Sequence, residues 1–374
     1  MRRLIKCVRK DKDTVKVLHI GEYVQGGVAT YVKNLLHHPD RPDIIDYLVC
    51  SEEKSDHQWP IPSERITYYS YTRSVYNLPK AMHNIMKQIH AIQPDIIYCH
   101  STWAGFLARF PMLFKGKPCR VIYNAHGWAF LRDVAEWKCR LYAFIERVLL
   151  FSTDIVVNVS NYEYQAALQY GLPDFKQKVI YSGIPSEMGK INPEVKLSPG
   201  KLNLLFVGRF DPQKGIDYLL QIFSKVKRND LHLTVIGDNV IGGGTYIEKK
   251  DTERVTFLGW VPHDELASYY NASDIVIMPS RWEAFGLVAI EAMKYGKAII
   301  VSNRGALPEI VQDGRNGYVF DFNRPEQLQQ ILHNLSLDRL RLFASNNKRD
   351  FLMKYQDIIF KKETYKLYES EKEI

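Results

Sequence analysis

The sequence lacks the features that would mark a membrane-spanning, secreted or disulfide-stapled protein. No run approaches the ~18 consecutive apolar residues that a bilayer-spanning helix needs. The basic N-terminus, "MRRLIKCVRKDKD", has neither the long apolar segment nor the small-residue cleavage site of a secretory signal, so we expect the cytoplasm. The five cysteines are odd in number and include no C-x-x-C pair, which favours reduced thiols over disulfides or a zinc site.

Motifs for dinucleotides, nucleic acids and bound metals are also missing. The loop "GEYVQGGVATYV" at residues 21–32 is not G-x-G-x-x-G, which argues against a dinucleotide oxidoreductase. No RNP, zinc-finger or helix-turn-helix signature supports nucleic acid as a partner. The "DKD" of residues 11–13 precedes the first expected strand, so we interpret it as solvated surface and not as a metal-binding D-x-D motif.

The composition describes a globular chain with an excess of positive charge. Hydrophobic residues make up 46% of the 374 residues and charged residues 25%, which suits a folded protein with ample core material. This length leaves room for about two domains. The formal net charge of +8 suggests an anionic partner, such as nucleic acid, a membrane surface or a phosphorylated small molecule, although it would equally serve solubility alone.

Short β-branched runs alternate with helical patterns, and this rhythm predicts two successive parallel α/β domains. In the first domain we expect strands at 15–20, 95–100, 119–126 and 154–160, with helices in 28–38, 79–92 and 136–151. Residues 182–201 are rich in Pro, Gly and Ser, which indicates a linker. In the second domain we expect strands at 202–210, 231–238, 254–260, 274–280, 298–302 and 317–320, and then a C-terminal helix within 354–368.

The predicted organisation is an N-terminal Rossmann-like domain at 1–185, a linker at 186–201, a second Rossmann-like domain at 202–350 and a helical tail at 351–374. In open α/β sheets, ligands bind beyond the carboxyl ends of the strands. We therefore expect the ligand site in loops that follow strands, in a cleft between the two domains.

The loop after the first strand of each domain suits phosphate. Gly26 and Gly27 directly precede a helical segment, where glycine lets the backbone approach a ligand and free N–H groups attract an anion. In "FVGRFDPQKG", Arg209 and Lys214 follow a strand, and two cations on one loop suit a diphosphate. The plainer interpretations are an ordinary strand-helix turn and two solvated cations.

Residues 280–296, "SRWEAFGLVAIEAMKYG", place Glu283 in a loop and Glu291 on the helix that follows. Glu291 is five residues past Gly286, about 7–8 Å along the helix axis, which does not suit two carboxylates that share one proton. Two separate sets of hydroxyls suit them better, with N–H groups at the helix start facing an anion in between. A sugar, a phosphate and a ribose in that order describe a nucleoside diphosphate sugar. The alternative is one residue favoured by the helix dipole and one solvated glutamate.

The arrangement resembles the retaining GT-B glycosyltransferases of family 4, the glycosyl transferases group 1, over nearly the whole chain. Its most specific element is E-x7-E, Glu283 to Glu291 within "EAFGLVAIEA". Beside it, in the family's order, stand "GGVATYV", "VGRFDPQKG", "FLGWVPHDEL", "YYNASDIVIMPS", "GALPEIVQDGRNGYVF" and a helical tail. The resemblance implies an α/β GT-B architecture whose last helix packs back toward the first domain.

The resemblance also implies a role for each matching residue. Glu283 matches the glutamate near the donor sugar's hydroxyls, and Glu291 matches the one that holds the ribose hydroxyls. Arg209 and Lys214 match the cations on the diphosphate. The other matched positions are Gly26 and Gly27 near the diphosphate, Phe285, Gly286, Leu287 and Val288 at the phosphate and sugar, Trp260 and Val261 at the nucleobase, and His126, which matches a histidine of the first domain near the transferred sugar. We expect His126, Glu283, Arg209 and Lys214 to act in catalysis.

Two segments depart from the family pattern. The usual "GDG" or "GEG" after the second strand of the second domain is replaced by "GDNVIGGG" at 237–244, so contacts to the nucleobase are expected to differ. The usual "NGID"-like turn before the linker is "SGIP" at 182–185, a change to which we attach little weight.

The resemblance implies transfer of a hexose-type sugar from a nucleoside diphosphate sugar, with UDP favoured, to an acceptor hydroxyl with retention of configuration. No cofactor is implied, and cationic side chains are expected to take the place of a divalent metal. The expected acceptor is a bacterial polysaccharide or lipid-linked glycan. A phosphorylase, an epimerase or a non-catalytic binder with the same donor pocket remains the alternative.

Residues 105–118, "GFLARFPMLFKGKP", mix large apolar and basic side chains. With the basic N-terminus, this segment could lie on the anionic inner face of the cell membrane and reach a lipid-linked acceptor. An ordinary packed helix with a basic rim explains the same pattern.

Overall fold

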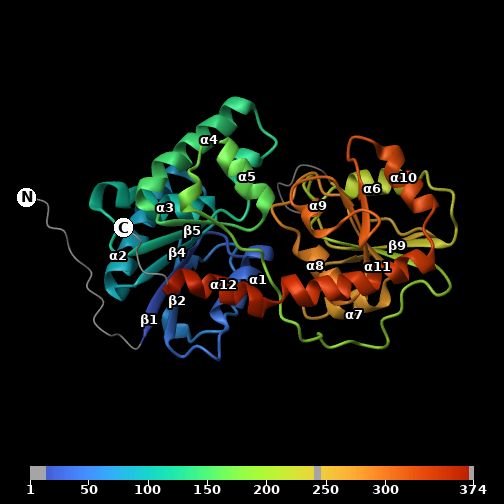
Figure 1. The fold of residues 1–374 in the computed structure, drawn as a ribbon, viewed down its shortest axis with the longest axis horizontal. Helices are drawn as coiled ribbons and strands as arrows, with labels where there is room; N and C mark the ends of the chain where they lie inside the picture. Colours follow the sequence, from blue (N-terminus) through green and yellow to red (C-terminus); the bar gives the residue numbers. More distant parts are fainter. Residues whose placement is uncertain (1–13, 240–245, 370–374) are drawn as a thin grey trace, which may run out of the picture. The chain divides into compact units, whose positions relative to one another are not determined.

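The computed structural model describes residues 14–239 and 246–369. The basic N-terminus with its "DKD" and all but the first three residues of "GDNVIGGG" lie outside the described residues. Contacts group the described chain into two compact units (Figure 1). Unit 1 consists of residues 14–158, 170–178 and 364–369, and unit 2 of residues 159–169, 179–239 and 246–363. Residues 159–169 and 179–185, which we had placed in the first domain, thus make most of their contacts within unit 2.

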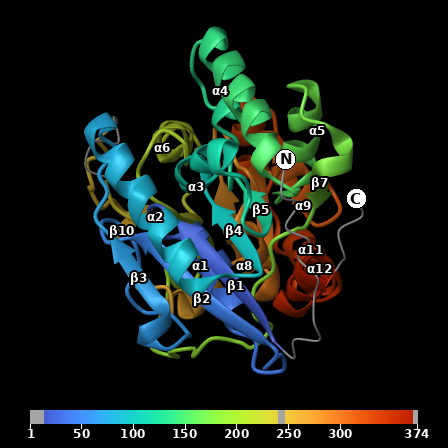
Figure 2. The same ribbon diagram turned by 90° about the vertical axis from the view of Figure 1, so that its left-hand side faces the viewer.

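Unit 1 is built on a seven-stranded sheet in the order β3-β2-β1-β4-β5-β6-β7. Its strands are β1 (Val15–Gly21), β2 (Ile44–Ser51), β3 (Ile66–Tyr69), β4 (Ile96–His100), β5 (Arg120–Asn124), β6 (Ile155–Asn158) and β7 (Gln177–Val179). Strand β1 pairs in parallel with both β2 and β4, and Figure 2 shows these strands side by side. Strands β1, β4, β5 and β6 confirm the four strands predicted for this domain.

Strands β2, β3 and β7 were not predicted. Strands β3 and β7 are short and lie at the two edges of the sheet, and most of their residues are only partly buried, so they give little hydrophobic signal. In β2, Asp46 interrupts an otherwise apolar run, although its side chain is buried. A buried carboxylate in a central strand requires partners, and these partners are described below.

The longer helices of unit 1 are α1 (Gly27–Leu36), α2 (Leu78–Ile92), α3 (Thr102–Lys115) and α4 (Glu136–Leu149). Helices α1, α2 and α4 confirm the three predicted helical segments, and α3 covers most of the apolar and basic segment at 105–118. Short 3₁₀ turns lie at Ser63–Arg65, Val75–Asn77, Ala129–Leu131, Leu150–Ser152 and Asp174–Lys176. Helix α2 buries Ala81, Ile85 and Ile89, which recur every four residues and so share one face. Helix α3 begins at Ser101, whose hydroxyl accepts a hydrogen bond from the Ala104 N–H at 3.3 Å.

Unit 2 is built on a six-stranded sheet in the order β10-β9-β8-β11-β12-β13. Its strands are β8 (Leu202–Val207), β9 (Leu231–Ile236), β10 (Val255–Gly259), β11 (Ile275–Met278), β12 (Ala298–Ser302) and β13 (Gly317–Phe320), and all six were predicted. Its helices are α5 (Asn161–Gln169), α6 (Ile216–Phe223), α7 (Leu266–Ala272), α8 (Leu287–Lys294), α9 (Leu307–Ile310), α10 (Pro325–His333) and α11 (Leu337–Asp350). A continuous core joins β8 to α6 through Leu204, Phe206, Leu219 and Phe223.

The last helix of the described residues is α12 (Asp357–Glu369), which follows a π-helical segment at Phe351–Tyr355. From Thr364 onward this helix belongs to unit 1, where Glu369 forms an ion pair with Arg41 at 2.9 Å. The tail helix therefore ends in the first unit, as the sequence predicted. Across residues 14–239 and 246–369, no helix combines the length and the apolar character needed to cross a membrane.

Each sheet has one point at which the strand order reverses direction. In unit 1 this point lies between β1 and β4, and in unit 2 it lies between β8 and β11. Loops that leave the carboxyl ends of such strands diverge to opposite faces of the sheet and open a crevice where ligands bind. The loops after β8 and β11 hold Lys214 and Glu283, so the fold places two predicted site residues at this crevice.

Candidate active site

Lys214 and Glu283 are in direct contact, although 69 positions separate them in the sequence. The Lys214 Nζ atom lies 2.5 Å from the Glu283 Oε1 atom, and the Ser280 hydroxyl donates to the same oxygen at 3.1 Å. The Glu283 side chain is 7% exposed and that of Lys214 is 21% exposed. A buried carboxylate is thus held by one cation and one hydroxyl, with the lysine at the more open side.

This pairing refines the prediction for the two cations. The sequence suggested two free positive charges on one loop, but Lys214 contacts Glu283, and Arg209 lies 3.0 Å from the Asp211 carboxylate. An ammonium group carries three donors, so Lys214 can keep Glu283 and still donate to an incoming anion. Arg209 is about half exposed, and its guanidinium has donors to spare.

The loops after β8 and β11 are tied into one piece by Arg281. Its guanidinium donates to both carboxylate oxygens of Asp217, at 2.8 and 2.7 Å, and to the Pro212 carbonyl at 2.7 Å. Gln213 adds a hydrogen bond to the Trp282 carbonyl at 3.2 Å. Such a forked pair fixes both position and orientation, so the two loops hold Lys214 against Glu283.

The sequence analysis did not assign Arg281 a role, although it stands two residues before Glu283 in the quoted stretch. Its pairing partner Asp217 lies in the first turn of α6, where an acidic residue is also favoured by the helix dipole. The only sequence signal was an arginine directly after a strand end. The distance between residues 217 and 281 in the sequence does not predict that their side chains form an ion pair.

Glu291 lies on α8, where its side chain is only 12% exposed, and it has two partners. The Tyr270 hydroxyl donates to Oε2 at 2.6 Å, and the His263 Nε2 atom lies 3.3 Å from Oε1. Burial raises the pKa of the Glu291 carboxyl, but the hydrogen bonds from His263 and Tyr270 outweigh it and hold that pKa below its usual value. The ionised form is therefore favoured, which is the form that accepts bonds from two hydroxyls.

The start of α8 lies between the two glutamates in the sequence. Gly286 is its N-cap residue, with φ of 111°, a backbone conformation that a side chain would strain. Leu287 and Val288 form the first turn, whose N–H groups have no partner within the helix, and Phe285 is buried beneath it. Such an N-terminus attracts an anion through its N–H groups and its dipole.

The residues predicted at the nucleobase lie on the loop after β10. Trp260 is 68% exposed and Val261 is partly buried, and His263 on the same loop reaches Glu291. This contact brings the predicted base-binding loop next to the predicted ribose-binding carboxylate. An exposed indole of this size is available for stacking against a flat ring.

The remaining predicted residues belong to unit 1. Gly26 is the N-cap residue of α1 with φ of 58°, and Gly27 is the first residue of that helix. His126 follows β5 and also has a positive φ, of 51°, which is uncommon for a residue with a side chain. The Tyr31 ring of α1 packs edge-on against the His126 ring with centroids 4.5 Å apart, so helix α1 and the His126 loop adjoin.

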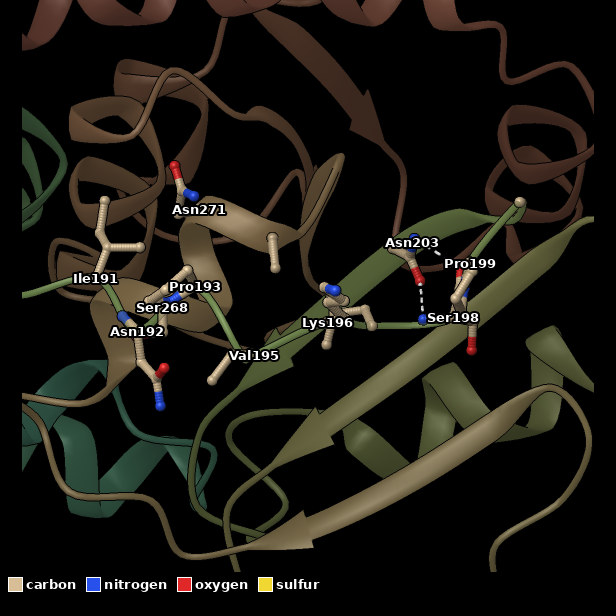
Figure 3. A pocket seen from close by; sticks show the side chains of 13 residues that line it. Ile191, Asn192, Pro193, Val195, Lys196, Ser198, Pro199, Asn203, Ser268 and Asn271 are labelled. Carbon is tan, nitrogen blue, oxygen red and sulfur yellow. Dashed lines mark hydrogen bonds between the residues drawn. The ribbon is translucent and has the colours of Figure 1, made fainter.

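A separate pocket of about 370 Å³ lies between the linker and helix α7 (Figure 3). It is lined by linker residues 191–193 and 195–200, by Asn203 of β8, and by Ser268, Asn271 and Ala272 of α7. The linker is anchored there, because the Asn192 N–H donates to the Ser268 hydroxyl at 2.9 Å and Asn203 bonds the backbone of Ser198. None of the predicted donor residues lines this pocket, so it is distinct from the candidate site.

Within the described part of the chain, no group of three or more His, Cys, Asp or Glu side chains is placed to hold a metal ion. The described cysteines at positions 50, 99, 119 and 139 form no disulfide with one another.

Comparison with known proteins agrees with this fold. Residues 25–187 match the family described as Glycosyltransferase Family 4, and residues 189–351 match Glycosyl transferases group 1. The "Uncharacterized 41.2 kDa protein in cps region" of Klebsiella pneumoniae is 35% identical over 364 residues, which is 92% of this chain and 99% of that protein. The lipopolysaccharide 1,2-N-acetylglucosaminetransferase of Salmonella typhimurium is 31% identical over 212 residues, 51% of this chain and only 54% of that enzyme.

Solved structures give the same fold at lower sequence identity. Anabaena Alr3699/HepE in complex with UDP and glucose has a TM-score of 0.78 at 17% identity, covering 96% of this chain and 100% of that one. WaaG, a glycosyltransferase involved in lipopolysaccharide biosynthesis, has a TM-score of 0.70 at 14% identity and covers 96% and 100%. With two consecutive family matches over most of its length and a two-unit Rossmann-like fold, the chain belongs to family 4 of the GT-B glycosyltransferases, the glycosyl transferases group 1.

Proposed function

We propose that the chain transfers a hexose from a nucleoside diphosphate sugar to an acceptor hydroxyl with retention of configuration, in the assembly of a bacterial polysaccharide or lipid-linked glycan. The observation that carries this proposal is the Lys214–Glu283 contact beside the N-terminus of α8. A diphosphate bound at that N-terminus would contact Lys214, which also contacts Glu283, the carboxylate proposed to bind the sugar. One side chain would then connect the leaving group with the group that orients the transferred sugar.

The chemistry follows from where charge grows. As the glycosidic bond breaks, negative charge builds up on the diphosphate, and Lys214, Arg209 and the first-turn N–H groups of α8 would stabilise it. Glu283 would accept hydrogen bonds from the sugar hydroxyls and so fix the ring. We propose attack on the same face that the diphosphate leaves, with a phosphate oxygen taking the acceptor's proton. Lys214 and Arg209 would thus stabilise the charge of the leaving diphosphate, as a divalent metal ion does in metal-dependent enzymes.

Glu291, Trp260 and Val261 would hold the nucleoside. The ionised Glu291 suits the two ribose hydroxyls, and the exposed His263 is the partner that they would replace more readily than the buried Tyr270. We favour UDP because HepE, a structural neighbour, is solved with UDP and glucose and with UDP-glucose. The cytoplasm, where nucleotide sugars are made, is the proposed compartment.

A donor screen tests this proposal. We expect one class among UDP-, GDP- and ADP-sugars to raise the melting temperature, since saturation at 100 times Kd stabilises a protein by about 2.7 kcal/mol. The same donor should be hydrolysed slowly without an acceptor. Binding without any turnover would indicate a non-catalytic binder, phosphate-dependent turnover a phosphorylase, and isomerisation without an acceptor an epimerase. Any of these outcomes, or the absence of any shift, would overturn the proposal.

Glu291→Gln tests the nucleoside site. Loss of charge-assisted bonds to the ribose should weaken UDP binding by roughly 10- to 100-fold, because such bonds contribute about 1.5–3 kcal/mol each. Titration calorimetry with UDP measures this change. Glu326→Gln, an exposed glutamate in the first turn of α10, is the matched control and should bind UDP normally. Unchanged affinity in Glu291→Gln would remove Glu291 from the site.

The proposal that the acceptor is lipid-linked depends on the exposed side chains of helices α3 and α4, which pack against each other in unit 1. Along α3, the rings of Trp103, Phe106, Phe110 and Phe114 form an unbroken row with successive centroids 6.1, 5.2 and 5.4 Å apart. Phe114 is 78% exposed. The sequence predicted an apolar and basic segment here, and the structure adds a second one that was not predicted.

That second segment is the outer face of α4. Trp137, Leu141 and Phe144 follow one another at helical spacing and are 64%, 45% and 55% exposed. Exposed cations accompany both helices, at Lys115, Lys117, Lys138, Arg140 and Arg147. Large exposed apolar side chains with a basic surround suit an anionic bilayer, where rings enter the interface and cations meet lipid phosphates. We propose that this face carries the enzyme to a lipid-linked acceptor.

A vesicle sedimentation assay tests this membrane contact. Phe114→Ser with Phe144→Ser should weaken binding to vesicles that contain phosphatidylglycerol by about tenfold or more, since each exposed ring loses roughly 1.5–3 kcal/mol of transfer energy at most. Tyr76→Ser, which removes a ring that is 91% exposed before α2, is the control. Equal binding by the double variant and the control would contradict a membrane role for α3 and α4.

A further inference from the structure

Five buried or half-buried side chains of unit 1 form one continuous hydrogen-bonded chain, which we call the His–Asp chain: His38, Asp46, His19, His100 and His126. Asp46 accepts bonds from His38 through one carboxylate oxygen and from His19 through the other, the latter at 3.1 Å. The His19 Nδ1 atom lies 3.0 Å from the His100 Nε2 atom. The His100 Nδ1 atom lies 3.2 Å from the His126 Nε2 atom. The predicted catalytic histidine is therefore the end of a chain that starts at Asp46.

The chain runs across four adjacent strands at the switch point of the sheet. Asp46 is on β2, His19 on β1 and His100 at the end of β4, while His126 follows β5. The side chains of His19 and His100 are fully buried, and that of Asp46 is 2% exposed. Side chains buried in this way have no water to bond with. Each donor must therefore pair with an acceptor of a neighbouring side chain, and this requirement sets the direction of every hydrogen bond in the chain.

Asp46 is the one carboxylate among the five side chains of the His–Asp chain, so it sets how many of the histidines can be protonated. Burial raises the pKa of Asp46, but the bonds from His19 and His38 outweigh burial and lower it, so Asp46 is ionised. Asp46 in turn raises the pKa of His38 despite the burial of that ring. One carboxylate offsets one positive charge, and the raised pKa of His38 makes this ring, at the edge of the chain, the member that favours the proton.

The two histidines at the other end are neutral. Burial, together with the neighbouring His19 and His126, lowers the pKa of His100 well below its usual value. Burial lowers the pKa of His126 to about 3. A neutral imidazole has one N–H donor and one bare nitrogen acceptor. A ring that donates to one neighbour must therefore accept from the other.

We propose that Asp46 fixes the tautomer of His126 through His19 and His100, so that His126 presents a bare Nδ1 to its surroundings. A carboxylate can only accept, so His19 donates from Nε2, and in the neutral form of the ring its Nδ1 is bare. His100 then donates from Nε2 to His19 and keeps a bare Nδ1. His126 donates from Nε2 to His100, and its own Nδ1 is left as an acceptor.

The geometry around His126 supports a fixed role for that nitrogen. Among the residues that the structure describes, Nδ1 of His126 has no hydrogen-bond partner, and the residue is partly exposed. The backbone at His126 is held in its strained conformation by a bond from its N–H to the Asn124 side chain at 2.8 Å. Tyr31 packs on the ring and limits its rotation.

An acceptor nitrogen selects the chemistry of its partner. A bare Nδ1 accepts a bond from a hydroxyl group and is repelled by a phosphate or carboxylate oxygen, which offers no proton. Within the proposed function, on which this step rests, His126 would therefore recognise a sugar hydroxyl and not the diphosphate. Asp46 is then a positioning residue that acts through two intervening rings, in the way that a second carboxylate fixes the tautomer of a ligand histidine.

Imidazole ¹⁵N NMR on the full chain tests the tautomer without any substrate. Long-range ¹H–¹⁵N correlations should show a protonated Nε2 and a bare Nδ1 for His126 in the unsubstituted protein. A protonated Nδ1 on His126 would overturn the proposal outright, whether or not the protein transfers sugar. This measurement also requires no variant to fold.

Asp46→Asn tests the cause, because an amide can donate as well as accept. We expect the His126 signals to show a mixed or reversed tautomer, and we expect kcat to fall by roughly 10- to 100-fold with the donor KM nearly unchanged. Asp43→Asn, at an exposed position next to Arg41, is the control and should keep the original tautomer. A folded Asp46→Asn protein with an unchanged His126 tautomer would show that Asp46 does not set it.

Discussion

Lys214→Ala is expected to lower kcat for sugar transfer by about 10²- to 10³-fold, the loss that follows removal of one preorganised donor from a developing anion. UDP binding should change much less, because the nucleoside contacts that we propose for Glu291 and Trp260 do not involve the lysine. The lysine also neutralises Glu283, whose carboxylate would keep only the Ser280 hydroxyl. Steady-state kinetics with the donor found in the screen, normalised to the folded fraction, measure the effect.

Coupling between the two residues gives a sharper result than either variant alone. Because Lys214 and Glu283 act as one unit, the double variant Lys214→Ala with Glu283→Gln should be little slower than the worse single variant. Lys225→Ala, which removes an exposed lysine just after α6, controls for the loss of charge and should leave kcat unchanged. Fully multiplicative losses in the double variant would show that Lys214 and Glu283 contribute separately.

The second unit was largely predictable because its signals are local. Each of its six strands is a short apolar run followed by a loop, and the E-x7-E spacing fixes Glu283 outside a helix and Glu291 on it. Spacing cannot say which side chains meet across loops. The contact between Lys214 and Glu283 and the fork between Arg281 and Asp217 depend on the order of β8 and β11 in the sheet, which the sequence does not state.

The His–Asp chain was missed for the same reason. In the sequence, His19, Asp46 and His100 are each a single polar residue in an otherwise apolar strand. A single residue of this kind does not by itself indicate a functional site. Only the order β2-β1-β4-β5 brings them together, and β2 itself was not predicted because Asp46 breaks its apolar run. A polar residue in each of several neighbouring buried strands is the signal that could have found this chain.

Gly305→Ala is the other substitution with a large expected effect, because Gly305 lies directly against the backbone of Glu283. Gly305 has φ of 61°, and a Cβ atom there would lie 2.0 Å from the Glu283 carbonyl oxygen and 2.7 Å from its nitrogen. The Ala306 N–H also donates to that carbonyl at 3.1 Å. The loop that carries Glu283 must therefore move, and a shift of about 1 Å at a reacting group can cost on the order of 10²-fold in rate.

A matched glycine separates this clash from backbone strain. Gly200 in the linker has φ of 73°, and a Cβ atom there would meet nothing within 4 Å, so Gly200→Ala pays only the cost of the left-handed conformation, about 1–2 kcal/mol. Gly305→Ala should lose more stability in urea unfolding and should also lose transfer activity, whereas Gly200→Ala should keep its kcat. Equal losses of stability with normal activity in both variants would mean that the Glu283 loop tolerates displacement, and the close approach at Gly305 would then not be what positions the carboxylate.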